Sequence, residues 1–216
     1  MAKIISAKEA CSFIKSGMTI LIGGFLKCGT PTEVIKEILK TDIKDLTVVG
    51  NDTSFADSDR GLLVSEKRCK KVIASHIGMN PETGRQMNSG ELEVELVPQG
   101  TLCERIRSAG AGLGGVLTPT GIGTEVEKGK QVVNVNGRDY LLELPLKGDV
   151  ALIYGSKVDK AGNIAFNGTT RNTNVVMATA ADIVIVEAEE FIDGYLNPNE
   201  VVISGVFVNY IIVKGK

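Results

Sequence analysis

The first candidate for chemistry is a glycine-rich loop between an apolar run and a helix start. The run Thr19–Ile22 is typical of a strand. Glycines let a backbone turn sharply and let a ligand approach it closely. A helix that begins after such a loop directs backbone N–H groups and the positive end of its dipole at one small volume. The candidate ligand-binding residues are Gly23, Gly24, Phe25, Leu26, Lys27, Cys28 and Gly29.

The residues after the loop predict where the helix begins. We expect Thr30 as the N-cap, Pro31 as the first helical residue, and Glu33 as the acidic member of a capping box. The glycine spacing, G-G-x-x-x-x-G, matches neither the G-x-G-x-x-G of dinucleotide-binding folds nor a phosphate loop that ends in Gly-Lys-Ser/Thr. The spacing therefore leaves two alternatives open, ligand binding and a tight turn that serves packing.

Two side-chain amides occupy similar places further along the chain. Asn51 follows the apolar run Leu46–Val49, and Gln99 lies between the predicted strand Glu93–Val97 and a predicted helix. Open α/β sheets bind ligands at the carboxyl ends of their strands, so both amides are candidate site residues. The alternative for Asn51 is an ordinary turn residue. The alternative for Gln99 is an amide that fixes the turn before the helix.

Cys28 is a candidate nucleophile, because a helix N-terminus lowers a thiol pKa. His76, the only histidine, would complete a Cys/His unit. Nothing in the sequence brings the two together, so a thiol that packs the loop is the simpler interpretation. We expect Glu104 to be a helix cap, Glu125 a surface charge and Glu187 a strand-end residue.

Composition and charge exclude several classes of function. The chain has 216 residues, a net charge of −2 and no basic run, so nucleic acid is not an expected partner. No apolar run could cross a membrane, and the N-terminus lacks the apolar core of a signal peptide, so we expect a cytoplasmic protein. With 4 scattered cysteines and 1 histidine, we expect no metal site.

Strands that alternate with amphipathic helices predict an α/β fold, a largely parallel sheet sandwiched between helices. The strong turn signal Asn136-Gly137 predicts a β-hairpin insertion between residues 132–135 and 140–144. Residues 1–216 contain no repeat or linker, so we expect a single domain. Strands are expected over 18–22, 46–49, 72–75, 93–97, 150–154, 183–186 and 206–213. Helices are expected over 7–15, 31–40, 61–67, 101–109 and 175–180. We also expect a polar connection from residue 80, and an ordered, glycine-rich wall of a site or interface over 110–124.

Taken together, these motifs resemble the α subunit of the two-subunit short-chain-acyl CoA-transferases, of the acetate/butyrate–acetoacetate type. The resemblance covers nearly the whole chain. One departure is Thr173, where the family pattern has an aromatic residue, and it bears either on the local packing or on the shape of the acyl pocket. The motifs that carry the resemblance are residues 17–19, 23–25, 29–31, 51–53, 74–78, 80–84, 98–102, 104–107, 118–121, 161–163 and 171–172.

The resemblance implies ping-pong chemistry. A glutamate carboxylate attacks the acyl-CoA thioester, and a glutamyl-CoA thioester carries CoA to the second acid. In this family the glutamate lies in the β subunit, inside a Ser-Glu-x-Gly motif. The nearest match here, Ser65–Arg68, lacks the glycine, so no nucleophile is assigned to this chain. The implied partner is a β subunit, in a heterotetramer or a larger assembly, and the chain is expected to be active only in that complex.

The resemblance also implies roles for the candidate residues. Residues 23–29 resemble the CoA-binding loop, Gln99 resembles the glutamine that stabilises the oxyanion, and Asn51 resembles a residue that lines the substrate pocket. CoA and acyl-CoA are expected as substrates, with no permanently bound cofactor. Two other interpretations stay open, a sugar-phosphate isomerase-like protein and a non-catalytic acyl-CoA-binding protein. The preferred acid and the number of αβ pairs are also left open.

Overall fold

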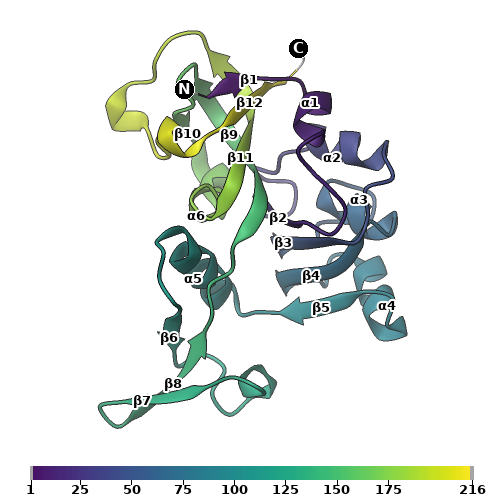
Figure 1. The fold of residues 1–216 in the computed structure, drawn as a ribbon, viewed down its shortest axis with the longest axis vertical. Coiled ribbons are helices and arrows are strands. Elements are labelled where there is room, and N and C mark those ends of the chain that lie inside the picture. The colour runs from purple at the N-terminus through teal and green to yellow at the C-terminus, as the bar shows by residue number, and fades with distance from the viewer. Residues whose placement is uncertain (1, 215–216) are drawn as a thin grey trace.

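The computed structural model describes residues 2–214, which have the predicted α/β architecture. Within those residues a nine-stranded sheet has the order β1-β12-β11-β9-β2-β3-β4-β5, with β10 paired to β9 (Figure 1). All pairs along this order are parallel, and β10 runs antiparallel to β9. The predicted largely parallel sheet is confirmed. The strands are β1 (Lys3–Ile4), β2 (Thr19–Ile22), β3 (Leu46–Asp52), β4 (Cys69–His76), β5 (Glu93–Leu96), β9 (Gly148–Asp159), β10 (Ile164–Ala165), β11 (Ala181–Ile192) and β12 (Tyr210–Val213).

Helices cover both faces of this sheet. Ile20 and Ile22 of β2 pack into one apolar layer and Leu21 packs into the other, because successive strand side chains point to opposite faces. The first layer includes α1, α2 and α3, and Gln86 of α4 donates to Val64 O of α3 at 2.9 Å. The second layer includes α5 and α6. The helices are α1 (Ala7–Cys11), α2 (Glu33–Leu39), α3 (Arg60–Ser65), α4 (Pro81–Ser89), α5 (Gln99–Gly110) and α6 (Asn174–Met177), with short 3₁₀ turns at Glu125–Glu127, Gly168–Arg171, Pro198–Glu200 and Gly205–Phe207.

The strand order reverses between β2 and β9. From β2 the chain moves outward through β3, β4 and β5, and from β9 it moves outward through β11 and β12 on the other side. Such a reversal leaves a crevice at the carboxyl ends of the strands, where α/β proteins bind ligands. The glycine loop leaves β2 at this point, and Gly23 N–H donates to Leu152 O of β9 at 2.9 Å.

The predicted hairpin is present and belongs to a three-stranded antiparallel sheet. Its strands β7 (Val132–Val135) and β8 (Arg138–Glu143) are joined by Asn136 and Gly137, both at positive φ, as a type I′ turn requires. Strand β6 (Val116–Thr118) pairs with the other side of β8, so part of the glycine-dense segment is a regular strand. Figure 1 shows this small sheet projecting beyond α5, away from the main sheet.

Several predicted boundaries are wrong. Helix α4 occupies the expected polar connection, because Asn80 caps it by accepting from Thr83 N–H and Pro81 starts it. Helix α1 ends at Cys11 instead of continuing to residue 15. Strands β9 and β11 each extend over 12 residues, well past the apolar runs that predicted them. Long-range pairing extends these strands, which no local pattern specifies.

The predicted cap of α2 is also wrong. The helix begins at Glu33, and Thr30 Oγ1 donates instead to Leu26 O at 2.7 Å. Glu187 of β11 is the actual cap, since its Oε2 accepts from Thr32 N–H and Glu33 N–H at 2.6 and 2.7 Å. Burial raises the pKa of the Glu187 carboxyl, and the two N–H donors oppose that shift. This carboxylate is therefore a helix cap supplied by a distant strand.

Helix α5 begins at Gln99, two residues before the expected N-cap Thr101. Its N-cap is Pro98, whose side chain makes no capping hydrogen bond. Glu104 therefore completes no capping box and forms an ion pair with Arg107 at 2.5 Å. Gln99 therefore lies in the first turn of a helix and not in the turn before it.

Candidate active site

Three of the nine predicted site residues meet at a cavity of about 300 Å³ at the carboxyl ends of the central strands, and the other six, all in the glycine loop, do not line it. The glycine loop contributes Phe25, β3 contributes Asn51, and α5 contributes Gln99. Thr173, where the resemblance predicted an aromatic residue, also lines the cavity, so its small side chain helps to set the shape of this space. The lining residues are Phe25, Asn51, Gln99, Gly100, Cys103, Asn172, Thr173 and Val176.

Asn51 and Gln99 form a hydrogen-bonded amide pair. Gln99 Nε2 donates to Asn51 Oδ1 at 2.5 Å, although the two residues are 48 positions apart. Asn51 is only 1% exposed and lies inside β3, which continues to Asp52 instead of ending before Asn51 as predicted. Gln99 is exposed. An amide nitrogen carries two hydrogens, so one N–H of Gln99 remains for a group in the cavity.

Contacts within the chain explain the glycines of the loop. A Cβ on Gly23 would lie 1.9 Å from Asn174 Oδ1, and a Cβ on Gly24 would lie 1.9 Å from Thr30 Oγ1. Gly24 also has a φ of 110°, which other residues rarely adopt. Packing therefore accounts for these two glycines without a ligand. The case for a binding loop depends on its place at the strand-order reversal and on its outward side chains.

Two asparagines before and within α6 hold the loop. Asn172 Oδ1 accepts from Gly24 N–H at 3.0 Å, and Asn172 Nδ2 donates to Cys28 O at 3.1 Å. Asn174 Nδ2 donates to Gly29 O at 2.9 Å. The sequence singled out Asn172 only through the resemblance, because no local pattern reveals that residues 148 positions apart meet.

A buried ion pair beneath the loop was missed entirely by sequence reasoning. Arg60 is 1% exposed, and its Nη2 lies 3.5 Å from Asp52 Oδ1. The guanidinium donates to the carbonyls of Ile22, Gly23 and Leu26 at 3.0, 3.2 and 3.1 Å. Asp52 Oδ2 accepts from Leu26 N–H at 2.9 Å. The ion pair therefore fixes the loop where it leaves β2.

The electrostatics keep this pair charged. Burial raises the pKa of the Asp52 carboxyl, but the positive charge of Arg60 and hydrogen bonds from Asn51 and two backbone N–H groups outweigh it, so the pKa lies below its ordinary value. Burial lowers the pKa of Arg60, yet the guanidinium stays protonated because arginine does not deprotonate in proteins. A fixed negative charge thus lies beside Asn51 at neutral pH.

The structure does not assemble a nucleophile from the candidates in this chain. Cys28 Sγ lies 3.3 Å from Thr169 Oγ1, and the ring of His76 lies 6.0 Å from that of Phe25. No hydrogen bond joins Cys28 to His76 within residues 2–214. Glu66 is exposed at the end of α3, away from the cavity. The eight lining residues, all from the described part of the chain, include no carboxylate.

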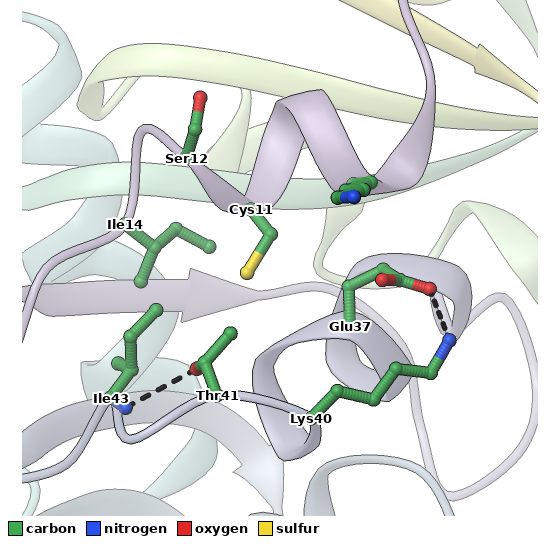
Figure 2. A pocket seen from close by; sticks show the side chains of 8 residues that line it. Cys11, Ser12, Ile14, Glu37, Lys40, Thr41 and Ile43 are labelled. Carbon is green, nitrogen blue, oxygen red and sulfur yellow. Dashed lines mark hydrogen bonds and ion pairs between the residues drawn. The ribbon is translucent and has the colours of Figure 1, made fainter.

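A larger cavity, about 790 Å³, lies between α1 and α2. Figure 2 shows Cys11 and Ile14 lining it, with Lys40 and Glu37 joined by an ion pair of 2.6 Å. Burial and the charge of Glu37 raise the pKa of the Cys11 thiol, which makes it a poor nucleophile. None of the predicted site residues lines this cavity, so we assign the candidate site to the smaller cavity, which Phe25, Asn51 and Gln99 line.

Among residues 2–214, no group of three or more His, Cys, Asp and Glu side chains is arranged to hold a metal ion. In that same part of the chain, no helix combines the length and the apolar character needed to cross a membrane. The four cysteines are all free thiols. The absence of a metal and of a permanently bound cofactor stays a prediction.

Comparison with known proteins identifies relatives along nearly the whole chain. The family model described as Coenzyme A transferase matches residues 4–214. The acetoacetyl-CoA:acetate/butyrate CoA transferase alpha subunit of Clostridium acetobutylicum is 54% identical over 212 residues, covering 98% of this chain and 97% of the relative. The acetate CoA-transferase subunit alpha of Escherichia coli is 49% identical over 213 residues, with the same two coverages of 98% and 97%.

Solved structures agree on the fold. Glutaconate coenzyme A-transferase from Acidaminococcus fermentans matches with a TM-score of 0.86 at 22% identity, over 98% of this chain and 75% of that one. An acyl-CoA transferase from Escherichia coli O157:H7, in a thioester complex with CoA, matches with a TM-score of 0.84 at 20% identity. That alignment covers 99% of this chain but 47% of the other, so this chain spans about half of that protein.

The largely parallel sheet, with a cavity at its strand-order reversal and an antiparallel hairpin sheet beside it, is the fold that this chain shares with these solved structures. This chain belongs to the coenzyme A transferase family, as the family model and the two full-length relatives show. The resemblance identified from the sequence motifs is therefore confirmed.

Proposed function

We propose that this chain is the α subunit of an enzyme that moves CoA between short-chain acyl-CoA and acetate, acetoacetate or butyrate. The observation that carries the proposal is the 54% identity to the Clostridium acetobutylicum α subunit over nearly the full length of both chains. A cavity of about 300 Å³ suits a short acyl group better than a long one. Neither a sugar-phosphate isomerase nor a non-catalytic protein is favoured, because the family and both relatives are transferases.

The proposed nucleophile is a glutamate of a β subunit. Its carboxylate attacks the thioester carbonyl and expels CoA as a thiolate, which leaves a mixed anhydride. The thiolate then attacks the glutamyl carbonyl, releases the first acid as a carboxylate, and forms a glutamyl-CoA thioester. The second acid reverses these steps. The absence of a carboxylate among the eight described residues that line the cavity supports a nucleophile from outside the chain.

Within this reaction we assign to Gln99 the stabilisation of the negative oxygen in each tetrahedral intermediate. Its remaining N–H is a suitable donor, and the N-terminus of α5 adds the positive end of a helix dipole. Asn51 is proposed to line the substrate pocket and to hold the Gln99 amide. Residues 23–29 are proposed to bind CoA, with the exposed side chains of Phe25 and Lys27 facing outward.

The proposed partner is a β subunit, in a heterotetramer or a larger assembly, because both full-length relatives are α subunits. Four free thiols support a reducing, cytoplasmic location.

We also propose a single domain for residues 1–216, of which residues 1, 215 and 216 lie outside the described part. Two apolar layers on one shared sheet support that assignment.

The deciding experiment combines this chain with a candidate β subunit and measures CoA exchange among acetate, butyrate and acetoacetate. Exchange is expected from the complex and not from this chain alone. Borohydride added after acyl-CoA should reduce the glutamyl-CoA thioester, and mass spectrometry should find the reduced glutamate in the partner. Turnover by this chain alone, or a label on one of its own glutamates, would contradict the proposal.

A further inference from the structure

Asp52 touches the amide pair as well as the loop. Its Oδ2 accepts from Asn51 Nδ2 at 2.9 Å and from Leu26 N–H at 2.9 Å. Its Oδ1 accepts from Ser54 N–H at 2.8 Å and faces Arg60. An ionised carboxylate can only accept hydrogen bonds. Every group packed against the Asp52 oxygens must therefore present a donor.

This requirement decides which way Asn51 faces. An amide has a donor end and an acceptor end, so with its nitrogen toward Asp52 its oxygen points to Gln99. Asn51 Oδ1 accepts from Gln99 Nε2 at 2.5 Å and lies 3.3 Å from Ser75 Oγ. The nitrogen end of Gln99 must therefore face Asn51. Reversing Asn51 would exchange the donor and acceptor ends of Gln99 and move its N–H groups away from their present position.

We propose that Asp52 is a positioning residue for the Gln99 donor: its charge, held by Arg60, orients Asn51, and Asn51 in turn orients Gln99. The inference rests on the proposed function, because it assigns a use to the Gln99 N–H in the reaction. The same charge also holds Leu26 and, through Arg60, the carbonyls of the glycine loop. A disturbance of the loop in an Asp52 variant would raise the KM for acyl-CoA, whereas a displaced Gln99 donor would lower kcat.

The test is Asp52→Asn in the complex with the β subunit. An amide at this position can donate as well as accept, so it no longer forces one orientation on Asn51. We expect kcat to fall about 100- to 1,000-fold, the effect of losing one oxyanion donor. In the double variant with Gln99→Ala, kcat should be no lower than with Gln99→Ala alone, because coupled residues are not additive. An additional multiplicative loss would overturn the proposal.

Asp159→Asn is the matched control, because Asp159 is fully buried and accepts from the N–H groups of Ala161, Asn163 and Leu196 without lining the cavity. It should lower the midpoint of urea unfolding and leave kcat unchanged, and an equal loss of kcat in this control would contradict the proposal. If Asp52→Asn does not assemble, Asn51→Ala is the alternative variant. It keeps the ion pair between Asp52 and Arg60 and removes the hydrogen bond between Asn51 and Gln99. Wild-type kcat in that variant would also overturn the inference.

A second readout does not depend on activity. The chain contains three glutamines, so ¹⁵N-glutamine labelling of the α chain within the complex gives few side-chain signals, and Gln99→Ala identifies one pair of them. These Gln99 signals should shift in Asp52→Asn and stay in place in Asp159→Asn. Unchanged signals in Asp52→Asn would contradict the positioning role. If the Gln99 signals shift in Asp52→Asn but the wild-type complex transfers no CoA, the positioning role is upheld and the proposed function is contradicted.

Discussion

Gln99 combines two properties that a catalytic hydrogen-bond donor needs. Its amide is held by a buried neighbour, Asn51, and Gln99 lines the cavity while it remains exposed. A donor that is fixed before the reaction costs no reorganisation when charge develops on the substrate oxygen. These properties support the proposed use of Gln99 as an oxyanion donor, and because Gln99 is part of α5 its amide does not fix a turn before that helix.

Gln99→Ala should lower kcat about 100- to 1,000-fold, because one oxyanion donor is lost. The KM for acyl-CoA should change little, because the bond strengthens only in the transition state. Steady-state kinetics of the complex measure both constants. Gln99→Glu is the companion variant: it keeps the shape of the side chain but presents an acceptor to Asn51 Oδ1, so a similar loss is expected. A change in KM alone would reassign Gln99 to ground-state binding.

At the scale of elements, a strand near the C-terminus caps a helix near the N-terminus. Glu187 of β11 accepts from two N–H groups at the start of α2, at the exit of the glycine loop. Helix α2 has 7 residues and no side-chain cap of its own, so its first turn depends on this carboxylate. The cap therefore joins the loop, the helix and the second half of the sheet.

Glu187→Ala should lower the free energy of unfolding by about 1–2 kcal/mol, the usual effect of removing a helix cap. Glu187→Gln should lower it less, because the amide oxygen still accepts. Because the pKa of Glu187 is raised in the folded chain, its contribution is full below the ordinary carboxyl pKa of about 4.3 and falls as pH rises through the raised value.

The difference in stability between wild type and Glu187→Gln should therefore shrink from about pH 4 to about pH 7, since the glutamine does not titrate. Urea unfolding at a series of pH values measures this difference. Asp182→Asn, which removes an exposed carboxylate on the same strand, serves as the control for the loss of a surface charge. A difference that grows toward pH 7 would contradict the raised pKa.

The sequence predicted the strands and helices better than it predicted the long-range hydrogen bonds and ion pairs that hold them in place. Apolar runs identified the central strands, because a parallel sheet covered on both faces needs continuous hydrophobic residues. The strand ends also placed Asn51 and Gln99 near one edge before the structure was known. Arg60 lies in a polar stretch that is typical of a surface turn, and only the tertiary structure shows that it is buried. The capping by Glu187 was equally hidden, since it spans 154 positions.

At the scale of the whole molecule, the stretch from the end of α5 into β6 exposes apolar side chains. Leu113 is 48% exposed and Leu117 is 43% exposed, and both lie near the helix that carries Gln99. Exposed apolar residues grouped beside a site are typical of a protein interface. Together with the cavity's lack of a carboxylate among the described residues, they support a β subunit that docks on this side.

Hydrogen exchange tests that surface directly. Amides in residues 110–124 should exchange at least about tenfold slower in the complex than in this chain alone, because a permanent interface excludes water from the backbone. Peptides covering residues 36–44, beside the larger cavity between α1 and α2, are the internal control and should not change. Protection of the control region without protection of residues 110–124 would contradict the proposed docking side.

The contacts of the glycine loop also determine when it can form. The loop occupies residues 23–29, but its backbone is held by Asn172 and Asn174, up to 148 positions later in the chain. Contacts between such distant residues form slowly, because a long stretch of chain must first be brought into place. During synthesis the loop therefore stays incomplete until α6 has left the ribosome. A partly made chain accordingly exposes a loop that still lacks the contacts holding its backbone in place.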